Sequence, residues 1–191
     1  SIPKFNFQVL QRAKAVIFTT LINKVGSIGL SLIPILLVER HVTTNQASSV
    51  MSTVRVTLIV GTLTSGFLID RLGSRFIVLA SLMMSAIGLG LLPFAPSAVL
   101  IALLGMLAQY GDGLMRVALR VLLTAAVPFH EHKEALAWLR MASNVGQVLS
   151  FSVGAVAGGL GTTTLFVFDS LTSLAAWVYG VKILRKTDVS K

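Results

Sequence analysis

The chain has 191 residues, of which 54% are hydrophobic and only 12% are charged, and its mean hydropathy is +0.85. A soluble domain carries about 25% charged residues, so the composition excludes an ordinary soluble domain and predicts a membrane protein. No cysteine is present, which excludes disulfides and thiol-ligated metal sites. The net charge of +9 is compatible with nucleic-acid binding, but most basic residues lie between apolar runs, which favours a membrane protein and no nucleic-acid partner.

Six apolar runs predict six transmembrane helices, since a bilayer core requires about 20 residues per helix. They are expected at residues 15–38, 47–69, 76–94, 98–126, 135–160 and 163–181. Residues 1–14 are predicted to form an amphipathic lead-in along the inner surface, and residues 182–191 a basic cytoplasmic tail. No separate cleavable signal is expected, because the first run is itself long enough to span.

The distribution of positive charge predicts the orientation in the membrane. Of the cations between the apolar runs, the outer segments hold only Arg40. Ten lie on the opposite side: Lys4, Arg12, Lys14, Arg71, Arg75, Lys133, Lys182, Arg185, Lys186 and Lys191. Because positive residues mark the cytoplasmic side, both termini are predicted to be cytoplasmic in a cell (inner or plasma) membrane.

Charged residues inside the predicted spans are expensive, at about 2.5–3.5 kcal/mol each near the bilayer centre, so they require partners or a water-filled cavity. In the first span, Lys24 follows Asn23 and has no carboxylate within reach on its own helix. It is a candidate for direct contact with a solute or counter-ion, with snorkelling to the interface as the alternative. Arg55 and Asp169 lie in the outer halves of the second and sixth spans, where they would neutralise each other.

The fourth span is the most polar, with Asp112, Arg116 and Arg120 spaced four apart on one helix face. For Asp112 and Arg116, an ion pair within the helix and a role in solute or proton binding remain equally open. Arg120 is close enough to the inner face to pair with Asp70. The fifth span places a further polar stripe on one face, namely Arg140, Asn144 and Gln147.

These residues define the candidate sites. Asp112 and Asp169 are the only carboxylates inside the spans and are the candidates for proton coupling. His130 and His132 have no further ligand nearby, so no metal site is predicted, and no arrangement suggests catalysis or a cofactor. The candidates for solute binding are Asn23, Lys24, Arg55, Arg116, Arg140, Asn144 and Gln147.

A charged loop separates the second and third spans. Gly73 is expected to reverse the chain with a positive φ, and Gly61 and Gly66 to admit a neighbouring helix closely. The series Gly66-x-x-x-Asp70-Arg71-x-Gly73-x-Arg75 resembles the signature loop of the major facilitator superfamily. The later element Arg140-x-x-x-Asn144-x-Gly146 and the stretch at residues 21–29 are similar to bacterial efflux-type members.

The resemblance implies an all-α membrane protein in which the six spans form two inverted three-helix repeats, the N-terminal half of the family's fold. A second six-helix half would come from the same chain or from a homodimer. The implied function is a secondary active transporter of a small solute that works by alternating access, with efflux and ion or proton coupling as the expected mode. A non-transporting scaffold or sensor is the alternative. The implied gating residues are Gly66, Asp70, Arg71, Gly73, Arg75 and Arg120.

The balance of charge inside the spans predicts the charge of the solute. Five cations (Lys24, Arg55, Arg116, Arg120 and Arg140) face two carboxylates, so an anionic or zwitterionic solute or lipid head group is expected. The rival hypothesis is that acidic residues of the second half neutralise these cations and leave a cavity for neutral or cationic drugs.

Overall fold

The computed structural model describes residues 7–157, 159 and 161–184, and within them every regular element is a helix. Short 3₁₀ turns within the described residues include η1 (Leu92–Phe94) and η2 (Phe129–Glu131). The long helices are α1 (Phe7–Val25), α2 (Gly29–Glu39), α3 (Thr44–Leu72), α4 (Ser74–Leu91), α5 (Ala98–Ala126), α6 (His132–Ala157) and α7 (Thr162–Leu184).

Among the described residues, five helical stretches are long and apolar enough to cross a membrane, and they coincide with five of the six predicted spans. They are Ala13–Glu39, Thr44–Leu72, Ser74–Phe94, Ala98–Ala126 and Thr162–Lys182. The predicted fifth span at residues 135–160 forms the single helix α6, but α6 is not among these stretches. Its polar stripe of Arg140, Asn144 and Gln147 lowers its mean hydropathy, so this span stays a prediction.

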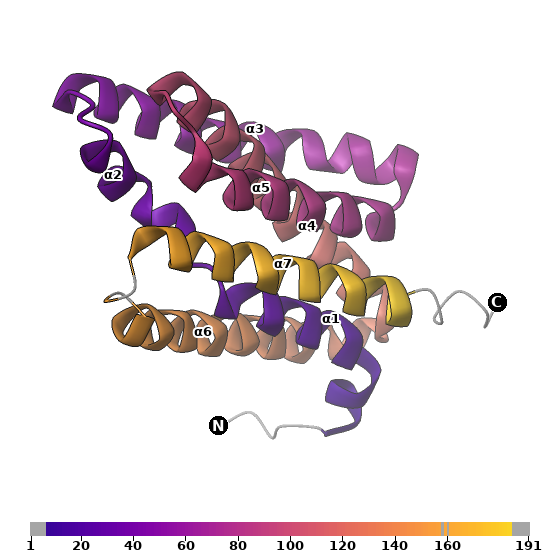
Figure 1. Cartoon of the computed structure of the whole chain (residues 1–191). Helices are drawn as coiled ribbons and strands as arrows, with labels where there is room; N and C mark the ends of the chain where they lie inside the picture. The colour runs from indigo at the N-terminus through magenta and orange to yellow at the C-terminus, as the bar shows by residue number, and fades with distance from the viewer. Residues whose placement is uncertain (1–6, 158, 160, 185–191) are drawn as a thin grey trace.

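The structure describes part of each predicted end segment. Residues 7–14 of the expected lead-in belong to α1, which continues into the apolar stretch that starts at Ala13, and their position along the inner surface stays a prediction. Residues 1–6 of the lead-in lie outside the described residues, as do residues 185–191 of the predicted basic tail. The Gly73 turn and the end of α7 lie at one end of the bundle, opposite the α2–α3 turn (Figure 1).

Most of the main contacts join helices that are far apart in the sequence. α3 and α4 both pack along α5, α6 and α7 both pack along α1, and α4 packs against α7. Apart from α4 and α5, consecutive helices touch much less, with few contacts between α5 and α6 or between α6 and α7. Figure 1 shows the result, with α3 and α5 in the upper part of the bundle and α1 and α6 in the lower part. This arrangement separates α5 from α6 and leaves room between them.

The first span is broken, whereas one continuous helix was expected at residues 15–38. α1 ends at Val25, a turn follows, and α2 begins at Gly29. The break lies against α7, where a Cβ atom at Gly26 would overlap the side chain of Thr172. Glycine at position 26 therefore permits the first span to touch α7 at the point where the span is interrupted.

The turn between α3 and α4 confirms the expected role of Gly73. Its φ is +83° and its ψ is 146°, a conformation that a side chain would disfavour strongly. Its N–H group donates to the carbonyl of Ile69 at 2.8 Å, which ends α3, and α4 begins at the next residue. The reversal therefore needs a single residue between two long helices.

Gly61 and Gly66 occupy the same helix but have different surroundings, which makes a matched test. A Cβ atom at Gly61 would lie 2.5 Å from the carbonyl oxygen of Tyr110 on α5, whereas one at Gly66 would meet nothing within 4 Å. We expect Gly61→Ala to destabilise the protein by about 1–2 kcal/mol, because the backbones of α3 and α5 must separate. Gly66→Ala is the control, and gains helix propensity. Thermal unfolding of both purified variants measures the difference, and equal stability would contradict close packing at Gly61.

Candidate functional site

A cleft of about 530 Å³ lies between α1, α5 and α6. It exists because α6 packs along α1 and makes few contacts with α5. Its volume falls in the range of about 300–1,000 Å³ that is usual for small-molecule sites. The lining residues are Thr20 and Lys24 of α1, Met115, Arg116, Leu119 and Arg120 of α5, and Lys133, Leu136, Ala137, Leu139, Arg140 and Ser143 of α6.

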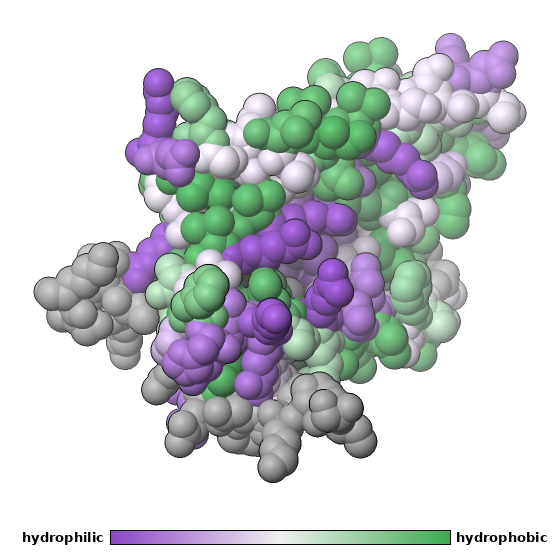
Figure 2. Space-filling model, turned by 180° about the vertical axis from the view of Figure 1, so that it is seen from behind, coloured by the Kyte–Doolittle hydropathy of each residue, from purple (hydrophilic) through white to green (hydrophobic). Residues whose placement is uncertain are grey.

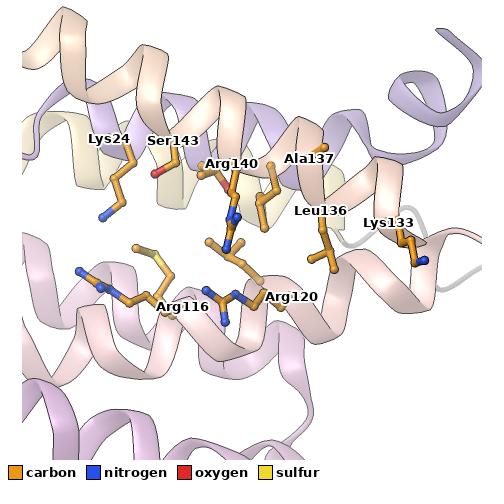
Figure 3. Close-up of a pocket in the computed structure, with 12 residues that line it drawn as sticks. Lys24, Arg116, Arg120, Lys133, Leu136, Ala137, Arg140 and Ser143 are labelled. Carbon is orange, nitrogen blue, oxygen red and sulfur yellow. The ribbon is translucent and has the colours of Figure 1, made fainter. Parts of the chain in front are cut away.

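The charged side chains that line the cleft are all positive. Five of the twelve lining residues are lysine or arginine, and none of the twelve carries a carboxylate. Figure 3 shows the side chain of Arg140 pointing into the gap from α6, with the guanidinium group of Arg120 on the α5 side of the same gap. From behind, hydrophilic side chains gather in the middle of the molecule and extend into its lower part, where they mix with apolar ones (Figure 2). The cleft is thus a basic region within an otherwise apolar bundle.

Two residues that line the cleft, Lys24 and Arg116, are linked by Asp112 in a group that we call the Lys24–Asp112–Arg116 triad. Oδ1 of Asp112 accepts a hydrogen bond from Nζ of Lys24 at 3.0 Å. Oδ2 accepts from Nε of Arg116 at 2.9 Å and lies 2.8 Å from its Nη2. The side chains of Lys24 and Asp112 are 14% and 10% exposed, whereas that of Arg116 is 53% exposed. The carboxylate therefore joins α5 to α1 while Arg116 stays open to the cleft.

The triad changes the interpretation of two predicted residues. Lys24 has no carboxylate on its own helix, as the sequence indicated, but α5 supplies one from 88 residues away. The predicted Asp112–Arg116 pair forms with the expected spacing of four residues, yet it is not confined to one helix. Lys24 is therefore a paired cation at the wall of the cleft, and Asp112 is the group that neutralises it.

Arg120 and Arg140 are exposed to the cleft and form no ion pair with the residues that the structure describes. Arg120 was expected to pair with Asp70, but Asp70 is exposed at the end of α3 and makes no ion pair with it in the described part of the chain. Elsewhere in the signature loop, the guanidinium of Arg71 lies 4.3 Å from the centre of the Phe67 ring. The structure thus assigns Arg120 to the cleft.

The other candidates for solute binding lie outside the cleft lining. Asn144 and Gln147 are exposed on α6, and Arg55 is exposed on α3. Asn23 is buried, and its Oδ1 accepts a hydrogen bond of 3.3 Å from Ser173 of α7. Of the seven predicted residues, the structure therefore brings only Lys24, Arg116 and Arg140 together.

Several lining residues were not singled out from the sequence. Lys133 was assigned to the inner loop, although it lies seven residues before Arg140 and so shares its face of α6. Ser143 and Thr20 are small polar residues of a kind that occurs throughout the chain, and their spacing alone gave no signal. Lys133 was therefore the one residue that helical periodicity was able to identify.

Asp169 lies at the break of the first span rather than in the cleft. Its Oδ2 accepts a hydrogen bond from the N–H group of Gly29 at 2.9 Å, and the residue is only 3% exposed. Gly29 is the first residue of α2, so Asp169 caps this helix from α7 and places a carboxylate at the positive end of its dipole. The expected neutralisation by Arg55 is not seen among the described contacts.

Comparison with known proteins agrees with this architecture. The family model described as Major Facilitator Superfamily matches residues 16–191. No curated protein matches the sequence at the significance required. The family match includes the signature loop at residues 66–75 and all three helices that line the cleft. Because it covers nearly the whole sequence, the chain belongs to the Major Facilitator Superfamily of membrane transporters.

Proposed function

We propose that this protein is a secondary active transporter, or one half of it, and that the cleft between α1, α5 and α6 is a wall of the solute pathway. The family implies transport of a small-molecule solute, and the proposal adds alternating access, the position of the pathway and coupling to an ion. The observation that carries it is the basic lining of the cleft. Charges at membrane depth persist where water or a solute reaches them, and a solute pathway supplies both.

The packing of the helices supports the proposed inverted repeats. We take α1–α2, α3 and α4 as the first repeat, and α5, α6 and α7 as the second. In this division α1–α2 corresponds to α5, α3 to α6, and α4 to α7. The contact between α3 and α5 then corresponds to the contact between α6 and α1, and the contact between α4 and α5 to the contact between α7 and α1. The α4–α7 contact maps onto itself. The same correspondence pairs α6 with the spanning helix α3, which supports α6 as the predicted fifth span.

A second six-helix half completes the proposed transporter, either from the same polypeptide or from a second copy of this chain. The proposed orientation has both termini on the cytoplasmic side of a cell membrane, and the direction of transport is proposed to be efflux. The positions of the turns support the orientation, because the basic Gly73 turn and the end of α7 lie at the same end of the bundle (Figure 1). The signature loop is proposed to gate that end.

Transport by the reconstituted protein tests this proposal. We expect proteoliposomes loaded with small solutes to release at least one of them when an ion gradient is applied. Arg140→Gln is expected to reduce that flux about tenfold or more, because Arg140 lines the proposed pathway. Lys182→Gln also removes one positive charge, but from an exposed residue at the end of α7, and is expected to leave the flux unchanged.

The outcome separates the transporter from the alternative. Absence of flux for every solute and gradient would favour the non-transporting scaffold or sensor. Equal losses in Arg140→Gln and Lys182→Gln would show that transport depends on net charge and not on the cleft.

A further inference from the structure

We propose that the cleft binds a small organic anion whose carboxylate or phosphate group is held between Arg120 of α5 and Arg140 of α6. This inference deepens the proposed function and rests on the assignment of the cleft to the solute pathway. It also differs from the expectation raised by the sequence, in which Lys24, Arg116 and Arg140 formed the anion site. The structure pairs Lys24 and Arg116 with Asp112 and leaves a different pair of arginines facing the cleft.

The charges around the cleft favour an anion. Five lining cations surround the space, and within the described part of the chain Asp112, behind the wall, is the only carboxylate in an ion pair with any of them. Four positive charges therefore remain in excess. Asp169, the other carboxylate inside the spans, accepts a hydrogen bond from Gly29 at the break of the first span. The remaining carboxylates of the described residues lie at helix ends or in connections, at Glu39, Asp70, Glu131 and Glu134.

The geometry of Arg120 and Arg140 suits one ligand group. The two guanidinium groups approach the same space from opposite helices (Figure 3). A guanidinium presents a planar fork of N–H donors that matches a carboxylate or a phosphate in bidentate fashion. An anion placed between them relieves the repulsion of two facing cations, which water alone screens less completely in a confined space.

The remainder of the lining favours an organic anion over a bare inorganic one. Apolar side chains of Met115, Leu119, Leu136 and Leu139 cover much of the wall. Such a surface gains free energy when it covers the apolar part of a ligand. Ser143 lies one turn from Arg140 and offers a hydroxyl group at the same wall. A ligand with an anionic group and a short carbon body satisfies both parts of the lining.

Binding of probe anions tests the inference without any measurement of transport. The protein is reconstituted in nanodiscs of phosphatidylcholine, and binding is measured by calorimetry for succinate and phenyl phosphate, with succinamide as the neutral probe and tetraphenylphosphonium as the cationic one. We expect at least one anion to bind, more weakly at high salt, and neither control probe to compete with it. Failure of both anions to bind at millimolar concentration would overturn the inference, as would preferred binding of tetraphenylphosphonium in the cleft.

Four variants locate the site. Arg120→Gln and Arg140→Gln are each expected to weaken anion binding about tenfold or more, whereas Arg140→Lys, which keeps the charge without the fork, should lose less. Lys182→Gln removes an equal charge outside the cleft and should bind as the wild type does. Equal affinities in Arg120→Gln, Arg140→Gln and Lys182→Gln would place the anion elsewhere and overturn the proposal.

The same chemistry would also hold an anionic lipid head group, and a second arm distinguishes this source. Discs that contain phosphatidylglycerol are analysed by native mass spectrometry for lipid retained by the wild type and by Arg120→Gln. Retention that depends on Arg120 and excludes the soluble anions assigns the site to a lipid head group. If the wild-type protein transports a solute but binds neither anion, this inference is wrong and the proposed function stands. If it binds an anion but transports no solute, only the proposed function is wrong.

Discussion

Replacing Asp112 by asparagine is expected to destabilise the protein by about 3–5 kcal/mol, the loss that is usual when one partner of a buried ion pair is removed. The carboxylate is shared by Lys24 and Arg116, at 3.0 Å and 2.8 Å. Lys24 carries most of the effect, because its side chain is only 14% exposed and Asp112 is its ion-pair partner. Arg116 is half exposed and regains water more easily.

A second substitution makes the reason for this loss testable. Lys24→Met removes the buried charge and keeps the length of the side chain, so Asp112→Asn combined with Lys24→Met should recover much of the lost stability. Thermal unfolding followed by the fluorescence of Trp138 and Trp177 measures the effect, with an expected decrease of about 6–20 °C for the single variant. If the double variant is no more stable than Asp112→Asn alone, the triad is not the source of the loss.

The contacts of the triad explain why the sequence predicted only part of it. Helical periodicity is sufficient to place Asp112 and Arg116 on one face, since residues four apart are always neighbours on a helix. The contact with Lys24 depends on how α1 packs against α5, and no spacing within either helix encodes that. The signature loop is the opposite case. Gly73 was predictable, because a reversal within so few residues needs a positive φ that glycine alone adopts readily.

The cleft shows the same division between local and long-range information. Arg120 was assigned to the loop because both lie near one end of the bundle, but the separation of α6 from α5 leaves it facing Arg140. The polar stripe on α6 was identified correctly, yet only its first member lines the cleft. Periodicity gives the face of a helix, whereas packing decides which part of that face remains open.

The break in the first span was not predictable either. Gly26 and Gly29 mark its two ends, but glycine is common within transmembrane helices and does not by itself interrupt them. The interruption is stabilised by α7, which is about 140 residues away in the sequence and supplies Asp169 as the cap of α2. The role of Asp169 as a cap therefore depends on the packing of α7 against the first span, which the sequence does not reveal. Removing this cap is expected to cause a second large loss of stability.

Asp169→Leu is expected to destabilise the protein by about 1–3 kcal/mol, the usual cost of a buried donor left without its acceptor. The N–H group of Gly29 loses its acceptor inside the bundle, and this hydrogen bond is itself the cap of α2. Asp169→Asn keeps an oxygen acceptor of the same shape and should lose clearly less. Thermal unfolding of the two variants measures the difference, and an equal loss in both would mean that the negative charge, rather than the hydrogen bond, stabilises the break.

The asparagine variant also decides between the cap and the proposed proton coupling. A residue that only caps α2 does not need to exchange a proton, so Asp169→Asn would leave the pH dependence of transport in proteoliposomes unchanged while lowering stability slightly. If Asp169 couples transport to protons, the asparagine variant should instead lose its response to a proton gradient, because an amide does not titrate.

Gly29→Ala provides an independent check on the cap, since its Cβ atom would lie 2.6 Å from Oδ2 of Asp169 and displace the carboxylate without removing it. If Gly29→Ala and Asp169→Asn reduce stability but both retain gradient-driven flux, Asp169 stabilises the break in the first span, and the proton-coupling proposal then rests on Asp112 alone.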